Sequence, residues 1–376
     1  MSQIVVILEE FMKNIITYAQ ENLKTFEHLP FHSVDSLILA SAAYIHFPDV
    51  IPEVENWKGI RLQELYRAEY FEEMFHNIPV STHARQLFFA LAASPRFRDI
   101  RVMGYTEQYD LTTEKQFSAV TFQIQPDLCY VAFRGTDSTL IGWKEDFNMA
   151  FQSPVPSQEE AVRYIEKAAL YCPGKILTGG HSKGGNLAVY AAAMCRENIQ
   201  CRIKKVYSHD GPGFLETTLQ SREFQNISSR IEKTLPQSSI VGMLLEHQEN
   251  FCIVRSNKTG LMQHDQYTWE IKENDFIYIE HLTKDAKFVD KTLTDWLNQI
   301  SKENRERFVD ALYSVLNANT LTTIDDFRAD WQTTVPATFH AISHLDGDTK
   351  KFLLHTLKKL GSMGIKNVSI FGKEKK

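Results

Sequence analysis

A short apolar run, a serine between two glycines and a helix of small residues follow one another in the middle of this chain. The apolar run ends at Leu177, and the serine, Ser182, lies in the segment Gly180-His-Ser-Lys-Gly184. This order predicts a buried strand, a tight turn and a helix that packs closely on a sheet. We expect glycine at 180 and 184 because a Cβ at either position would collide with the neighbouring strand or helix.

The predicted turn gives the serine a chemical interpretation. It would hold the Ser182 oxygen clear of the fold, above the N-terminus of the following helix. Backbone N–H groups and the positive end of the helix dipole favour negative charge at that place. A serine hydroxyl is a weak nucleophile until a base removes its proton, so this interpretation requires a histidine and a carboxylate. The alternative is a glycine-rich strand–helix turn without any chemistry.

Three histidines are candidates for the base. We predict His264, because it follows a predicted strand over residues 250–255 and lies in a loop that contains Gly260. His209 also stands at the end of a predicted strand and is the second candidate. His181 adjoins the serine, but the geometry of such a turn normally points that residue away.

Asp210 is the predicted carboxylate. It ends the strand after the serine's helix, and the glycines and proline that follow fix the turn. The chain order is then serine, acid, histidine, which is one of the orders that such a site adopts. An aspartate that merely caps its turn is the alternative interpretation. Asp265, which is next to His264 in sequence, and Glu246 are weaker options for the acid.

A site of this kind also needs two donors for an oxyanion. One is the amide of Lys183, directly after the serine. The other is Thr136 in the loop after a central strand, through its N–H and its hydroxyl. We expect Arg134 and Asp137 to pair with neighbours and to brace that loop.

Strand and helix patterns alternate through the middle of the chain. Alternating or apolar runs predict strands at 100–105, 116–124, 128–133, 203–208 and 250–255, and helical patterns cover 158–171, the segment after Ser182, and 216–233. The first three strands look antiparallel, and the later ones indicate a mostly parallel sheet covered by helices on both faces. The fold class is therefore α/β.

Helical patterns dominate both ends of the chain. At the N-terminal end they cover residues 1 to about 28, a helix from Val34 with Ser33 as its N-cap, residues 59–76, and a helix that begins at Ser81 or Thr82. From about residue 288 helices are predicted near 292–300, at 301–317 and at 346–360, followed by a weak strand pattern at 367–371. We predict a domain over 1–288 that includes the N-terminal helices and a helical C-terminal appendage over 289–376.

Charge and cysteine usage limit the function classes. The formal net charge of −6 argues against a nucleic-acid binder. Five cysteines without a C-x-x-C pair indicate free thiols in a reducing compartment, although a Cys195–Cys201 disulfide is an alternative. The first residues lack the basic region of a signal peptide, and no stretch has the 18 or so apolar residues that a membrane span needs. We expect a cytoplasmic protein that makes at most transient contact with a membrane surface, and the oligomeric state stays open.

With these residues in hand, the sequence resembles the α/β-hydrolase superfamily and, within it, the class-three lipases. More closely, it is similar to a largely uncharacterised bacterial family of lipase-related, α/β-hydrolase-like proteins. The resemblance covers roughly residues 30–285 and rests on Phe133-Arg-Gly-Thr136, Gly142-Trp-Lys-Glu-Asp-Phe-Asn148, Gly180-His-Ser-Lys-Gly-Gly-Asn186, Asp210-Gly-Pro-Gly-Phe214 and Gln263-His-Asp265. It implies an α/β-hydrolase fold and a serine hydrolase that cleaves carboxylic esters, with lipid or acylglycerol esters as substrates and without a metal or organic cofactor.

One position departs from the class-three lipases. They place the acid in an Asp-x-Val-Pro segment before the histidine strand, and the matching segment here is Ser239-Ile-Val-Gly242. Either Asp210 has taken over the acid's role or the triad is incomplete. Two further hypotheses therefore stand beside the esterase: a catalytically weak or inactive scaffold protein, and an amidase or peptidase that uses the same residues. Residues 141–160 and the N-terminal helices are candidates for a lid by position alone.

Overall fold

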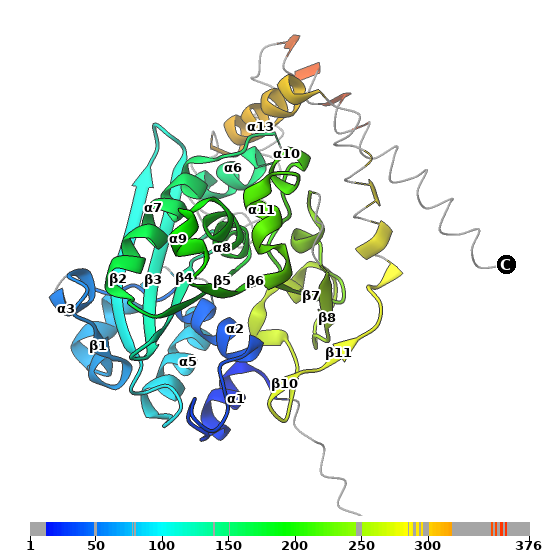
Figure 1. Cartoon of the computed structure of the whole chain (residues 1–376). Coiled ribbons are helices and arrows are strands. Elements are labelled where there is room, and N and C mark those ends of the chain that lie inside the picture. The colour runs from blue at the N-terminus through cyan, green and yellow to red at the C-terminus, as the bar shows by residue number, and fades with distance from the viewer. Residues whose placement is uncertain are drawn as a thin grey trace, which may run out of the picture.

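The structure is a computed structural model of the chain. It describes residues 13–48, 51–76, 80–137, 140–149, 151–245, 250–284, 286–288 and 301–317, together with single positions at 78, 291, 292 and 295 and several between 347 and 358. Within these residues one nine-stranded sheet, in the order β1-β2-β3-β4-β5-β6-β7-β8-β11, carries helices on both faces. This is the predicted α/β-hydrolase architecture (Figure 1).

The first strands of the sheet are antiparallel and the following ones are parallel, as predicted. β1 to β4 pair antiparallel, β4 to β8 pair parallel, and β11 returns antiparallel against β8. The strands are β1 (Ile60–Arg61), β2 (Arg101–Asp110), β3 (Lys115–Gln125), β4 (Leu128–Phe133), β5 (Lys175–His181), β6 (Ile203–His209), β7 (Ile231–Pro236), β8 (Phe251–Val254) and β11 (Tyr278–Ile279). A separate hairpin is formed by β9 (Ile271–Lys272) and β10 (Asp275–Phe276).

The parallel strands stand in the sheet in the order of the sequence, and this decides where the connecting helices lie. Right-handed crossovers that always advance in one direction place their helices on the same face. One hydrophobic cluster accordingly joins these helices to a single face of the sheet. They are α7 (Pro156–Tyr171), α8 (Lys183–Met194), α9 (Glu197–Gln200), α10 (Glu216–Leu219) and α11 (Arg222–Ile227).

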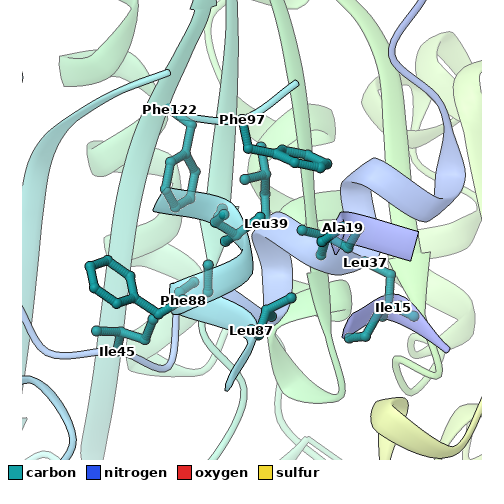
Figure 2. Packing of buried hydrophobic residues seen from close by; sticks show 14 of the residues in the cluster. Ile15, Ala19, Leu37, Leu39, Ile45, Leu87, Phe88, Phe97 and Phe122 are labelled. Carbon is teal, nitrogen blue, oxygen red and sulfur yellow. The ribbon is translucent and has the colours of Figure 1, made fainter. Parts of the chain in front are cut away.

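The N-terminal helices cover the opposite face. Figure 1 shows them, in blue, across the sheet from the green helices. Leu37 and Leu39 of the second helix, with Leu87 and Phe88 of a later one, pack together against Phe122 of the sheet (Figure 2). The helices of this face and the segment beside it are α1 (Ile15–Glu21), α2 (Ser33–Ala42), α3 (Pro52–Glu55), the 3₁₀ turns η1 (Leu62–Leu65) and η2 (Ala68–Tyr70), α4 (Phe71–Met74) and α5 (Ser81–Ala93).

Alternation along β4 shows how one strand serves both layers. Cys129, Val131 and Phe133 belong to the cluster under α7 and α8, whereas Tyr130 and Ala132 belong to the cluster under α2 and α5. Successive side chains of a strand point to opposite faces, so an apolar run without polar interruptions is what a strand covered on both sides requires.

Three predictions for the N-terminal third need correction. The first helix covers Ile15–Glu21 rather than 1–28, because Asn14 caps its start and the chain turns away at Asn22; residues 1–12 lie outside the described part. The second helix begins at Ser33, and its N-cap is His32, whose ring nitrogen accepts the Val34 amide. Residues 59–76 form a short strand and single turns instead of one helix.

The strand β7 was not predicted, because a helix was expected over 216–233. The helical part ends with η3 (Ser228–Arg230), and Ile231 begins a strand between β6 and β8. Its sequence, Ile-Glu-Lys-Thr-Leu-Pro, has a polar centre, yet Lys233 and Thr234 are buried. This strand matters for the site, since Ser239 lies in the turn that follows it.

Two helices lie beside each other at the top of the sheet as drawn in Figure 1. They are α6 (Leu140–Asn148) and the C-terminal α13 (Lys302–Asn317), which pack on each other. The helix over 301–317 is thus confirmed. The other C-terminal predictions, at 292–300, 346–360 and 367–371, fall largely or wholly outside the described residues. The domain boundary at 288/289 stays a prediction.

Candidate active site

Ser182 stands in the turn between β5 and α8, as predicted. Its backbone has φ 58° and ψ −134°, and its amide donates to the His209 carbonyl of the neighbouring strand (2.9 Å). A Cβ on Gly180 would stand 2.3 Å from the Gly184 carbonyl carbon, and one on Gly184 would stand 2.1 Å from the Phe133 oxygen. Both glycines are therefore required by backbone contacts, which is the reason given for them from sequence.

Three predicted side chains form one hydrogen-bonded series. The Ser182 Oγ lies 3.0 Å from His264 Nε2, and His264 Nδ1 lies 2.6 Å from Asp210 Oδ2. With Nδ1–H directed at the carboxylate, Nε2 is free to accept the serine proton. The Asp210 side chain is buried, whereas 27% of the His264 side chain is exposed. The histidine is therefore open to solvent while the carboxylate is shielded from it.

The Asp210 carboxylate is held from its other side by the segment after β7. Its Oδ1 accepts the Ser239 hydroxyl (2.5 Å) and the Gly242 amide (3.1 Å). Asp210 itself adopts a left-handed backbone conformation, with φ 50°. Ser239, at the position where the class-three pattern carries the acid, thus acts as a donor to the acid from the preceding strand.

His209 and Asp265, two other candidates for base and acid, have other partners. His209 is buried between the hydroxyls of Thr234 (2.7 Å) and Ser36 (2.9 Å), and burial lowers its pKa to about 3. It is a core histidine with both ring nitrogens satisfied. Asp265 caps the 3₁₀ turn η6 (Gln266–Thr268) by accepting the Tyr267 amide. Glu246 lies outside the described residues.

The loop that carries His264 is fixed by the residue before it. His264 ends the 3₁₀ turn η5 (Gly260–His264), and Gln263 is buried. The Gln263 amide oxygen accepts the Ser238 amide (2.7 Å), and its carbonyl accepts the Trp269 indole N–H (2.9 Å). Gln263 therefore joins the histidine loop to the segment that holds Asp210.

Thr136 lies beside the serine turn in the predicted oxyanion loop. A Cβ on Gly135 would come within 2.7 Å of the His181 oxygen and 3.2 Å of the Ser182 Cβ, so this loop rests directly on the turn. The Thr136 hydroxyl donates to Asp146 Oδ2 (2.5 Å). Its methyl faces Gly142, where a Cβ would stand 2.7 Å away. The threonine is therefore fixed by α6 on two sides.

Lys183 contributes two different groups. As the first residue of α8 its amide has no partner within the helix, which leaves it available at the turn. Its side chain is buried, and its ammonium donates to Glu145 (3.0 Å) and to the Gln116 side chain and carbonyl (2.9 Å each). Glu145 also accepts the amides of Gln116 and Ser157. Sequence reasoning assigned the amide and missed this buried ion pair.

Arg134 braces the oxyanion loop, as predicted. It is buried, its guanidinium lies 2.5 Å from Glu107, and it also faces Asp137 at 3.8 Å. Burial opposes ionisation of Glu107, but hydrogen bonds from His46 and Tyr105 and the Arg134 charge hold the pKa of that carboxyl well below its usual range.

Residues 91–314, more than half of the chain, match the model of the Mbeg1-like family. The chain belongs to the Mbeg1-like family. In this Mbeg1-like chain the match spans the strands β2 to β11 and all five residues of the predicted site, while α1 to α4 and most of α5 precede it. A comparison with curated proteins finds no match.

Several solved structures of lipases are similar to about half of the Mbeg1-like chain. A Rhizomucor miehei lipase–propeptide complex is 17% identical, with 51% of this chain and 66% of that one covered and a TM-score of 0.34. The M37 lipase is 12% identical over 57% of this chain and 70% of that one, with a TM-score of 0.35. A Penicillium expansum triacylglycerol lipase is 12% identical over 50% of this chain and 78% of that one, with a TM-score of 0.30. The chain thus spans just under two thirds of the first of these proteins.

Two searches of the described residues complete the description. None of their helices has both the length and the apolar character needed to cross a membrane. No cluster of three or more His, Cys, Asp or Glu side chains among them is arranged to hold a metal ion.

Proposed function

We propose that this chain is a serine hydrolase that cleaves carboxylic esters through an acyl-enzyme, with lipid or acylglycerol esters as the substrate class. Ser182 attacks the ester carbonyl, His264 takes its proton, and Asp210 orients the imidazole and stabilises the imidazolium. The observation that carries the proposal is the series Ser182–His264–Asp210, with hydrogen bonds of 3.0 and 2.6 Å.

The reaction has two balanced halves. In the first, the serine oxygen bonds to the carbonyl carbon, and His264 returns the proton to the departing alcohol. In the second, His264 deprotonates a water that attacks the acyl-enzyme, and the proton goes back to Ser182 as the carboxylic acid leaves. The amides of Lys183 and Thr136 stabilise the oxyanion of both tetrahedral intermediates, while the Thr136 hydroxyl donates to Asp146 and so holds the loop in place.

The hydrogen bond between His264 and Asp210 favours this proposal over an inactive scaffold. The scaffold hypothesis arose because Ser239 stands where an acid was expected. His264 is nevertheless hydrogen-bonded to a carboxylate, that of Asp210, and Ser239 donates a hydrogen bond to the same carboxylate. The strained backbone of Ser182 points the same way, because such conformations persist chiefly where function requires them.

The test is covalent labelling with a fluorophosphonate, a probe that reacts with activated serines. We expect wild type to be labelled, Ser182→Ala to be unlabelled and His264→Ala to be almost unlabelled. A panel of esters and amides at equal concentration then separates esterase from amidase activity. A folded wild type that is not labelled, and that cleaves no ester of the panel, would mean that the scaffold hypothesis is correct.

The acid needs a test of its own. Asp210→Asn should reduce the labelling rate by about 10³- to 10⁴-fold, because an amide favours the wrong imidazole tautomer. Ser239→Ala should reduce it by about 10-fold, the effect of one hydrogen bond to a charged group. If Asp210→Asn is labelled like wild type, Asp210 is not the acid.

A further inference from the structure

We propose that His181, the residue before the serine, is a positioning residue for His264, and that Tyr44 supports it by donating a hydrogen bond to the other nitrogen of its ring. The inference rests on the proposed function and adds two residues to it. From sequence, His181 was expected to point away from the site and Tyr44 was not considered.

The contacts of His181 lead to His264. Its Nε2 lies 2.8 Å from the His264 carbonyl oxygen, and the two imidazole rings face each other with centroids 4.6 Å apart and planes 35° from parallel. On the other side, its Nδ1 lies 3.4 Å from the Tyr44 hydroxyl. Both His181 and Tyr44 are buried, with 3% and 7% of their surface exposed.

These contacts assign the proton on the ring. A carbonyl oxygen only accepts, so His181 must donate through Nε2–H. In a neutral imidazole Nδ1 is then an acceptor, and the Tyr44 hydroxyl must donate to it. The His264 carbonyl therefore selects the tautomer of His181, and the Tyr44 hydroxyl stabilises that tautomer as the donor to Nδ1.

The environment keeps His181 neutral as well. Burial is the main reason that its pKa lies well below the usual 6.5, and the charge of His264 adds to this effect. Neutrality matters because His264 becomes an imidazolium during the proposed reaction. A second positive ring at 4.6 Å would oppose that step, whereas a neutral ring does not.

The link has a simple geometric consequence. His181 is covalently joined to Ser182 and hydrogen-bonded to the backbone of His264, so the nucleophile and the base are positioned by the same residue. Tyr44 connects this pair to the oxyanion loop, since a Cβ on Gly135 would stand 2.2 Å from its hydroxyl. A shift of 1 Å between reacting groups costs about 100-fold in rate, so a small loss of registry should be measurable.

The test compares two amides of different length at position 181. The side-chain nitrogen of glutamine takes the place of Nε2, and that of asparagine takes the place of Nδ1. We expect His181→Gln to keep the fluorophosphonate labelling rate within about 3-fold of wild type, and His181→Asn to lower it by about 10- to 100-fold. With an ester substrate the loss should appear in kcat, with KM unchanged. Tyr44→Phe should lower the rate by about 3- to 10-fold.

Equal rates for the Gln and Asn variants would overturn the inference, provided that both unfold cooperatively at similar temperatures. If His181→Asn does not fold, Tyr44→Phe decides the question: an unchanged rate overturns the inference, and a 3- to 10-fold loss supports it.

A second measurement separates this inference from the proposed function. ¹H–¹⁵N spectra of the imidazoles in the wild-type protein should show His181 as the neutral Nε2–H tautomer between pH 5 and 8, with a change at His264 in Tyr44→Phe. That result without any labelling would leave the arrangement intact and reject the hydrolase. A charged or Nδ1–H His181 at pH 7 would reject the arrangement, whatever the labelling shows.

Discussion

The carboxyl group of Asp146 lies beside the serine turn in surroundings that favour its protonated form. Its Oδ2 accepts the Thr136 hydroxyl, while its buried Oδ1 has no hydrogen-bond partner within the described part of the chain. Burial raises the pKa of this carboxyl to about 6, against the opposing effect of the Lys183 charge. Asp146 therefore changes charge close to neutral pH, at one contact from the predicted oxyanion loop.

This environment predicts a pH-dependent stability. A carboxyl whose pKa is raised on folding binds its proton more tightly in the folded state, so its contribution falls as pH rises from about 4 to 6. Asp146→Asn keeps an acceptor for Thr136 and removes the titration. Relative to wild type, the free energy of unfolding of the variant should rise by about 2 kcal/mol between pH 4 and pH 7. Urea unfolding of both proteins across this range measures the difference. If their free energies of unfolding change equally with pH, the prediction is contradicted.

At the scale of elements, α6 is joined to its surroundings by four polar side chains. Lys144 pairs with Glu114 and with Asp310 of α13, and Asn148 donates to Glu114. Glu145 accepts a hydrogen bond from the Lys183 ammonium, and Asp146 accepts one from the Thr136 hydroxyl. The part of the lid candidate that α6 forms is therefore anchored on three sides, which argues against its opening as a lid.

The buried pair of Lys183 and Glu145 should be the strongest of these links. Removing one partner leaves an uncompensated buried charge, so Lys183→Met and Glu145→Gln should each lower the free energy of unfolding by about 3–5 kcal/mol. The double variant leaves no buried charge and should lose clearly less than the sum. Chemical denaturation of the four proteins tests this. Additive losses would mean that the two residues act independently.

Local signals explain why much of the site could be predicted. Gly180 and Gly184 mark the turn because backbone atoms leave no room for a Cβ at either position. Asp210 stands directly after a predicted strand, and His264 lies in the loop that follows another. The roles of these residues remain predictions until labelling tests them.

What could not be predicted depends on the tertiary environment. The strand β7 has a polar centre that no alternation pattern reveals, because it lies between β6 and β8 in the sheet and is buried along nearly its whole length. The helix expected over 59–76 fails where Ile60 and Arg61 pair with β2 instead. The ion pair of Lys183 with Glu145 joins residues 38 positions apart in the sequence. The contact between His181 and His264 spans 83 positions, and no local sequence pattern encodes contacts over such separations.

At the scale of the whole molecule, one face of the sheet depends on helices outside the family match. The match begins at residue 91, whereas α1, α2 and most of α5 precede it. These helices cover Val120, Phe122 and Ala132 of the sheet. They also supply Ser36, which is hydrogen-bonded to the buried His209.

Removal of residues 1–94 should therefore prevent a native fold. The truncated chain would expose the apolar face of β2 to β6 and leave the His209 ring with one partner fewer. We expect aggregation or a compact state that binds a hydrophobic dye and lacks near-ultraviolet circular dichroism. Size-exclusion chromatography and both spectra decide this against full-length protein, and a monomer with cooperative unfolding would show that the helices are dispensable.

The order of the strands has a consequence for biosynthesis. Because β3 to β8 lie in the sheet in the order in which the ribosome makes them, each strand can add to an edge that is already present. The residues of the proposed site follow the carboxyl ends of these strands in the same order: Thr136 after β4, Ser182 after β5, Asp210 after β6, Ser239 after β7 and His264 after β8. A nascent chain thus carries Ser182 for 82 further residues before His264 is made, and under the proposed function the nucleophile is activated only when the last parallel strand has joined the sheet.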